Sequence, residues 1–209
     1  ADWAPEEATA AVLGWALGGY AFTRYRERDK ERASLVGPEG ADLAYVERAV
    51  GATTLVRDLI NTPAADLGPA ELAEAAEALA ESHGGTAEVI VGDELLQRNY
   101  PAIHAVGRGS ARAPRLVDLT WGEKEAPKVT LVGKGVCFDS GGLDLKPAAN
   151  MLRMKKDMGG AANVLGLAGM IMGAGFGLRL RVLIPAVENM VSGDAFRPGD
   201  VLQTRKGKT

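Results

Sequence analysis

Four charged side chains in the stretch Val132–Gly160 have the types and spacing that suit chemistry. Lys134, Asp139, Lys146 and Asp157 follow one another at intervals of five, seven and eleven positions. Glycines lie between and after them, and a glycine-rich backbone can approach closely to whatever those side chains hold. Carboxylate oxygens and amine nitrogens that converge on such a loop suit a hard or borderline divalent metal ion. The sequence therefore predicts a metal site in this stretch.

The elements that must position these side chains are a strand on either side of the stretch. The apolar, β-branched run Val129–Val132 breaks at Gly133, which predicts a buried strand that ends at Lys134. Another strand is predicted over Leu178–Val187, so that Glu188 also lies at a strand end. In α/β proteins, sites lie at the carboxyl ends of parallel strands.

The remaining elements predict an α/β fold. Apolar residues recur with a helical period over Gly40–Leu59, and Pro63 stops this helix. Gly68 and Pro69 open a second helix, which ends at His83. Other segments with clear patterns are helices over residues 6–20 and 159–173, a strand over 87–91, a helical turn over 93–98 and an outer strand over 114–121. Strands that alternate with helices indicate a mainly parallel or mixed sheet flanked by helices.

Aromatic residues near the start of the chain are interpreted as structural. Trp15 and Tyr20 are predicted to belong to the core, and Phe22–Arg28 to a surface strand or loop.

Composition excludes several classes of partner. The 209 residues are 46% apolar and 24% charged, with a net charge of −3, so neither nucleic acid nor an anionic membrane is indicated. The apolar stretch Val164–Ile171 is far shorter than the roughly 20 residues of a membrane span. The single cysteine, Cys137, excludes an internal disulfide and is compatible with a reducing cytoplasm. The N-terminus lacks the features of a secretory signal.

Three other chemistries fail on the residues present. Arg112 and Leu178 occupy the place of the third glycine after Gly107 and Gly173, so neither stretch is a dinucleotide fingerprint, and Lys134 lacks a phosphate-loop context. Cys137 has no neighbouring histidine in the sequence and is interpreted as a small buried apolar residue.

Serine chemistry is not indicated either, because Ser140 lacks the Gly-x-Ser-x-Gly pattern of a serine nucleophile. The two aspartates leave more than one interpretation open. On pattern alone, Asp139 and Asp157 are helix caps, surface carboxylates or members of a site.

Longer motifs favour the site. The segments KGVCFDSGG from Lys134, KPAANM from Lys146 and MKKDMGGAA from Met154 resemble the metal-binding half of the leucyl (cytosol) aminopeptidase family of dinuclear metallopeptidases. The resemblance continues through ENMVSG from Glu188 and RPGD from Arg197. RDLINTP, which ends at Pro63, resembles the start of that family's catalytic domain, so the likeness covers roughly residues 41–209.

The resemblance implies a role for each side chain. Lys134 would be a neutral-amine ligand, Asp139 a carboxylate that bridges two metal ions, and Asp157 a ligand of the same ion as Lys134. Lys146 would polarise the scissile carbonyl, and Met154 would line the pocket for the substrate's first residue. This division agrees with physical chemistry, since a coordinated lysine must lose its proton, whereas an uncoordinated one stays charged.

The implied activity is hydrolysis of the N-terminal residue of peptides by a water activated by two divalent ions, Mn²⁺ or Zn²⁺. By resemblance, the parent enzyme would be a cytoplasmic homo-hexamer. Residues 1–40 would be the tail of an N-terminal domain, 41–60 a connecting helix, and 61–209 a partial catalytic α/β domain.

The resemblance also sets a limit on this chain. The family places an Asn-Thr-Asp-Ala-Glu-Gly-Arg segment, with two more carboxylate ligands and an arginine, soon after the Gly-Lys-Thr that matches 207–209. The sequence ends before that segment, so we expect this chain alone to bind metal weakly and not to turn over peptide. The alternatives are an inactive fragment and a scaffold or binding protein that retains half of the site.

Overall fold

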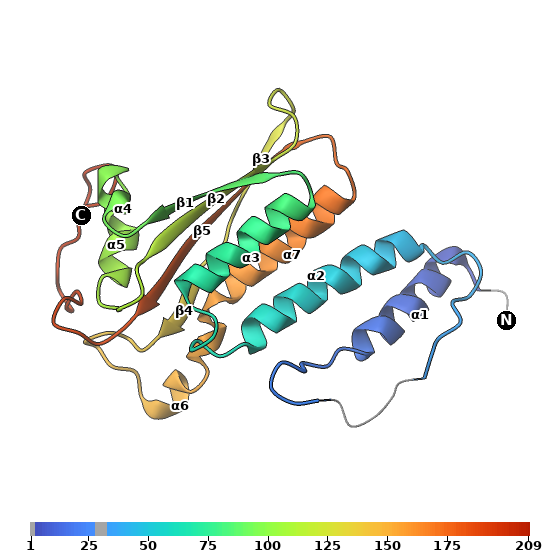
Figure 1. The fold of residues 1–209 in the computed structure, drawn as a ribbon, viewed down its shortest axis with the longest axis horizontal. Helices are drawn as coiled ribbons and strands as arrows, with labels where there is room; N and C mark the ends of the chain where they lie inside the picture. The colour runs from blue at the N-terminus through green and yellow to red at the C-terminus, as the bar shows by residue number, and fades with distance from the viewer. Residues whose placement is uncertain (1–2, 28–32) are drawn as a thin grey trace.

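The computed structural model describes residues 3–27 and 33–209, so Arg28 of the predicted Phe22–Arg28 segment lies outside it. Its helices are α1 (Pro5–Gly18), α2 (Leu43–Asn61), α3 (Pro69–Ser82), α4 (Glu94–Gln97), α5 (Pro101–Gly107), α6 (Ala148–Met151), the 3₁₀-helix η1 (Met154–Met158) and α7 (Gly159–Gly173). Its strands are β1 (Thr86–Val91), β2 (Arg115–Trp121), β3 (Lys128–Val132), β4 (Gly135–Asp139) and β5 (Arg179–Asn189). Figure 1 shows the long helices on one side of a single sheet.

The sheet is mixed, with β5 at its centre. β1, β2 and β5 pair antiparallel, while β3 and β4 both pair parallel with β5. β4 follows β3 along the same side of β5, so the two short strands share one long neighbour. Asp139, the last residue of β4, pairs with Asn189, the last residue of β5.

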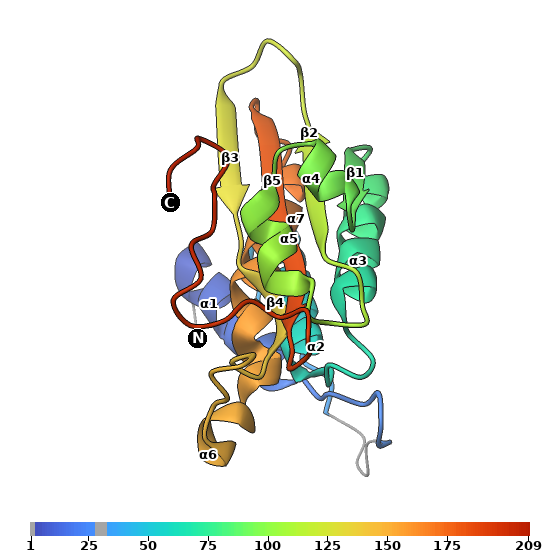
Figure 2. The ribbon, with the colours of Figure 1, turned by 90° about the vertical axis from the view of Figure 1, so that its left-hand side faces the viewer.

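Side chains that alternate along the strands build a core on each face of the sheet. Leu180, Val182 and Ile184 of β5 belong to the large cluster that α3 and α7 cover. Leu183 points the other way, into a small cluster of Ile90, Leu95 and Leu116 beside α5. Figure 2 shows α4 and α5 in front of the sheet, on the side away from α3.

The long helices form further layers. α2 packs against α7, and α1 packs against α2 (Figure 1). The predicted helix ends are confirmed at α3, where Gly68 precedes the first turn and its N–H donates to Glu71 Oε2 at 2.9 Å. None of the helices in residues 3–27 and 33–209 has the length and apolar character needed to cross a bilayer.

Several expectations about burial and position were wrong. β3 is an edge strand, with Val132 66% exposed, because within the described residues it pairs with β5 alone. β2, predicted as an outer strand, lies between β1 and β5. Trp15 is 47% exposed because α1 buries only Ala8 and Val12. Residues 22–27 form a loop, in agreement with the surface strand or loop predicted there.

Candidate metal and catalytic site

Lys134 and Asp157 meet beside the end of β3. Lys134 follows β3, and its Nζ lies 2.8 Å from Asp157 Oδ2. The Asp157 side chain is 13% exposed, whereas that of Lys134 is 60% exposed. Oδ2 is buried and, apart from this ion pair, accepts no hydrogen bond from any described residue. A buried carboxylate oxygen without a hydrogen bond is a strong candidate for a cation ligand.

Asp139 forms the second pair, at the end of β4. Its Oδ2 lies 3.1 Å from Lys146 Nζ, and its Oδ1 accepts hydrogen bonds at 2.9 Å from the Gly141 N–H and from Asn189 Nδ2. Burial by itself raises the pKa of Asp139, but these hydrogen bonds and the Lys146 charge outweigh it and lower the pKa below its usual value. Asp139 is therefore held as a carboxylate.

A close approach of backbones places Lys134 against the start of α7. The Ala161 N–H donates to the Lys134 carbonyl oxygen at 2.9 Å. A Cβ atom on Gly133 would lie only 2.7 Å from the Ala161 Cα. Only glycine fits at this crossing, which explains why the strand breaks immediately before the lysine. Since η1 packs against β4, the two lysine and carboxylate pairs lie on adjacent elements.

The loop after β4 returns Lys146 to Asp139. Gly141 has a φ of 90°, a left-handed conformation that favours glycine, and a Cβ there would lie 2.2 Å from the Asp144 carbonyl oxygen. The Lys146 N–H donates to the Ser140 carbonyl oxygen at 2.9 Å and closes the loop. The seven-residue spacing between the aspartate and the lysine therefore corresponds to one compact turn.

Met154, the predicted pocket residue, is the first residue of η1 and is half-buried. The next residue, Lys155, donates from Nζ to the Asn61 carbonyl oxygen at 2.7 Å and so ties η1 to the end of α2. No described contact assigns a substrate pocket to Met154.

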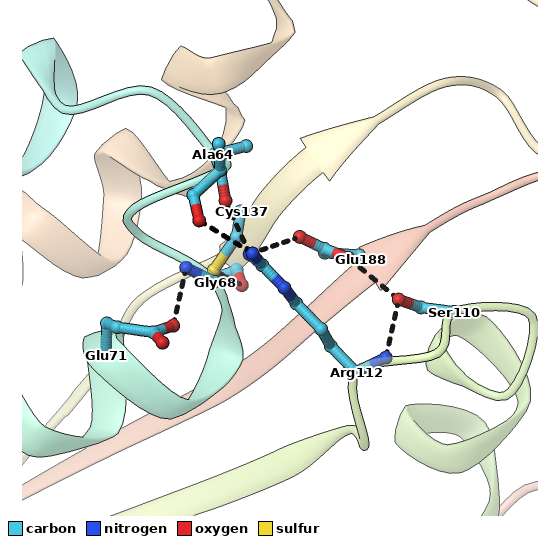
Figure 3. A network of polar contacts seen from close by, with 9 residues as sticks. Ala64, Gly68, Glu71, Ser110, Arg112, Cys137 and Glu188 are labelled. Carbon is cyan, nitrogen blue, oxygen red and sulfur yellow. Dashed lines mark hydrogen bonds and ion pairs between the residues drawn. The ribbon is translucent and has the colours of Figure 1, made fainter.

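A buried polar network lies beside the pairs, at the end of β5 (Figure 3). Glu188 is 7% exposed and accepts hydrogen bonds from Ser110 Oγ at 2.7 Å and from an Arg112 amine at 3.2 Å. Arg112 also donates to the carbonyl oxygens of Ala64 and Ala65, in the segment between α2 and α3. The guanidinium thus joins three segments that are far apart in the sequence. The sequence pattern draws attention to Arg112 only because it occupies the place of the third glycine in a dinucleotide-binding motif, and so it does not predict this network.

Cys137 and Ser140 have structural surroundings. Cys137 is 1% exposed, as predicted, and burial followed by the nearby Glu188 charge raises the pKa of its thiol to about 12. The Ser140 hydroxyl donates to the Asn189 carbonyl oxygen at 2.7 Å. Neither side chain is arranged as an activated nucleophile.

The donor set in this region fits part of a divalent cation site. The described residues contain no group of three or more histidine, cysteine, aspartate or glutamate side chains placed to hold a metal ion. Asp139 and Asp157 lie on adjacent elements, with Lys146 Nζ beside the first and Lys134 Nζ, at 2.8 Å, and Lys156 Nζ, at 3.9 Å, beside the second. Two carboxylates and a lysine amine are hard and borderline ligands of the kind that a divalent cation takes.

The mixed α/β layer thus carries lysine and carboxylate pairs beside the ends of β3 and β4, an arrangement that suits part of a divalent cation site. Among known families, the description "Cytosol aminopeptidase family, catalytic domain" matches residues 54–209, and "M17 aminopeptidase, N-terminal domain" matches residues 1–38. The chain belongs to the M17 cytosol aminopeptidase family.

Individual relatives cover nearly the whole chain. A probable cytosol aminopeptidase of Corynebacterium efficiens is 41% identical over 96% of this chain and 42% of its own length. The crystal structure of the Coxiella burnetii cytosol aminopeptidase superposes with a TM-score of 0.93 at 51% identity, covering 97% of this chain and 44% of that one. The bottromycin maturation enzyme BotP in complex with Mn has a TM-score of 0.88 at 41% identity, covering 99% and 46%. The chain therefore spans less than half the length of these relatives.

Proposed function

We propose that the whole protein that contains this chain is a metal-dependent aminopeptidase, which removes the N-terminal residue of peptides. The observation that carries the proposal is that the two lysines reach two different carboxylates. Lys134 meets Asp157, and Lys146 meets Asp139, on adjacent elements of a chain of this family. We infer separate roles for the two lysines from these separate partners.

Lys134, Asp139 and Asp157 would hold two divalent ions together with ligands from elsewhere in the whole protein. When bound, these ions supply an activated water and a Lewis acid for the peptide carbonyl. To hold an ion, Lys134 would have to act through a neutral amine, because an ammonium group has no lone pair. Asp157 Oδ2 lies 2.8 Å from Lys134 Nζ, so the two atoms would lie next to the same ion.

Lys146 would act on the substrate and not as a metal ligand. Its ammonium group is balanced by Asp139 at 3.1 Å, and it is 30% exposed, so it can turn from the carboxylate to the scissile carbonyl oxygen. A fixed positive charge at that oxygen stabilises the charge that develops in the transition state. We assign Met154, half-buried beside Asp157 on η1, to the apolar pocket for the substrate's first residue.

The proposal also includes the metal ions, the cellular location and the oligomeric state of the whole protein. We infer Mn²⁺ or Zn²⁺ as the ions, the former supported by the Mn complex of BotP, and a cytoplasmic location, supported by the names of the relatives. A homo-hexamer is proposed from family likeness, and light scattering of the whole protein tests it.

Hydrolysis of leucine p-nitroanilide by the whole protein, after chelation and addition of Mn²⁺ or Zn²⁺, tests the activity. We expect Asp139→Asn to lower turnover by more than about 100-fold, the upper end of losses for outer-shell metal partners. Glu77→Gln removes an equal charge from an exposed position on α3 and serves as the control. Activity that survives chelation, or that Asp139→Asn leaves intact, would contradict the proposal.

A further inference from the structure

The two oxygens of Asp139 have unequal surroundings. Oδ1 accepts two hydrogen bonds at 2.9 Å, from the Gly141 N–H and from Asn189 Nδ2. Oδ2 contacts Lys146 Nζ alone among the described polar groups, at 3.1 Å. A carboxylate oxygen has about two acceptor positions, so Oδ1 is filled and Oδ2 has one position open.

The backbone of Asn189 is anchored by hydrogen bonds, and its side-chain amide oxygen lies close to another residue. Its backbone carbonyl accepts hydrogen bonds from the Ser140 N–H at 3.0 Å and from Ser140 Oγ at 2.7 Å. Its amide oxygen lies close to Gly142, where a Cβ would approach it to 2.7 Å. The amide nitrogen therefore faces Asp139, because an ionised carboxylate can only accept.

The preceding residue anchors the strand end from the other face. Neighbouring side chains of a strand point to opposite faces of the sheet. Glu188 points to Ser110 and Arg112 (Figure 3). Asn189 points to Asp139, so rotation of β5 about its axis would break both sets of contacts.

We propose that Asn189 is a positioning residue for the metal site: it holds Oδ1 of Asp139 so that Oδ2 is the oxygen presented to a divalent cation. The inference rests on the proposed function, since it assumes that Asp139 is a ligand. Asn189 itself contacts neither cation nor substrate in this assignment. Its contribution is to remove the rotational freedom of a carboxylate that would otherwise have to be ordered when the cation binds.

Titration of the whole protein, freed of metal, with Mn²⁺ alone and followed by the loss of the free-ion electron paramagnetic resonance signal, tests the assignment. We expect Asn189→Ala to weaken Mn²⁺ binding by about 10-fold, the lower end of outer-shell effects. Asn163→Ala, which removes an exposed amide bonded only to the Gly159 carbonyl oxygen, should leave binding unchanged. Asn189→Leu, similar in shape but without a donor, repeats the test if the alanine variant fails to fold.

A second measurement needs no metal. Freed rotation of Asp139 should shift the Gly141 amide resonance and speed its hydrogen exchange in Asn189→Leu, while residues in β1 stay unchanged. Wild-type affinity in both Asn189 variants, with an unmoved Gly141 amide, would overturn the assignment and leave the proposed function standing. Absence of any Mn²⁺ binding by the wild-type whole protein would overturn both.

Discussion

Lys134 and Lys146 have different environments although both meet a carboxylate. The Lys134 amine is largely exposed beside a buried carboxylate oxygen without a hydrogen bond. The Lys146 amine is half as exposed and meets a carboxylate that also accepts two other hydrogen bonds. These differences support separate roles, a ligand and an electrophile.

The Cys137 thiol gives a direct test of burial near the site. Because burial raises its pKa to about 12, the thiol stays protonated at pH 8 and has little thiolate to react. We expect iodoacetamide to label the folded chain at pH 8 very slowly, and the urea-unfolded chain rapidly, as followed by mass spectrometry. Complete labelling of the folded chain at the rate of the unfolded one would show that the thiol is not enclosed.

The Arg112 network makes a prediction about stability. Arg112→Ala leaves Glu188 buried without its cation, and such an unpaired charge costs about 3–5 kcal/mol when both groups are fully buried. Arg112 is 39% exposed, so we expect a loss of about 2 kcal/mol in urea unfolding. Arg98→Ala, which breaks an exposed ion pair with Glu88, is the control and should have a much smaller effect. Equal losses in the two variants would argue against the network.

Only some residues of the candidate site can be recognised from the sequence around them. Asp139 and Lys146 stand out because charged residues between glycines are unusual, and they form one pair of the candidate site. Asn189 belongs to the ENMVSG motif, but that motif gave it no role. Its partner is 50 residues away, and that contact depends on the register between β4 and β5.

At the scale of elements, the long helices and the short β1, α4 and β3 were predictable, whereas β4 and the order of the strands in the sheet were not. The predicted helix over 159–173 has the observed bounds of α7. β4 was missed because Gly135 and Cys137 carry little strand signal, and a bulge between Val136 and Phe138 interrupts its pairing. The exposure of β3 depends on which strands flank it, and the residue pattern within a strand contains no information about its neighbours. For the same reason, the sequence wrongly predicted β2 as an outer strand.

The contact between α2 and α7 depends on Gly166. A Cβ there would approach Val56 Cγ2 to 2.6 Å and the Ala52 carbonyl oxygen to 3.1 Å. We expect Gly166→Ala to destabilise the fold by about 1–2 kcal/mol, since overpacking outweighs the helix propensity gained.

Gly169→Ala, in the same helix, is the matched control for this prediction. A Cβ there meets only Leu79 at 3.4 Å. It should be neutral or stabilise by up to about 1 kcal/mol in urea unfolding. If the two variants had the same stability, the helix contact would be looser than described.

At the scale of the whole molecule, α1 is attached mainly through α2. Arg57 donates to the Leu17 carbonyl oxygen at 3.1 Å, and the Tyr20 hydroxyl donates to Asp58 at 2.7 Å. The large core cluster contains no residue of α1. The site therefore lies in a unit that α1 borders but does not build.

Deletion of residues 1–40 tests this division of the chain. We expect residues 41–209 to unfold cooperatively, with a Tm lowered by less than about 10 °C, given about 2–4 °C per kcal/mol for a chain of this size. Circular dichroism on heating measures both. A broad, non-cooperative transition would show that the N-terminal helix is part of the core.

The central claim is that Lys134 holds metal while Lys146 acts on the substrate. Metal content and kcat of the whole protein, measured side by side for Lys134→Met and Lys146→Met, test it most directly. We predict that Lys146→Met retains wild-type metal content and loses about 10²–10³-fold in kcat, whereas Lys134→Met loses bound metal. A Lys146→Met protein depleted of metal, or a Lys134→Met protein with a full complement, would contradict the account.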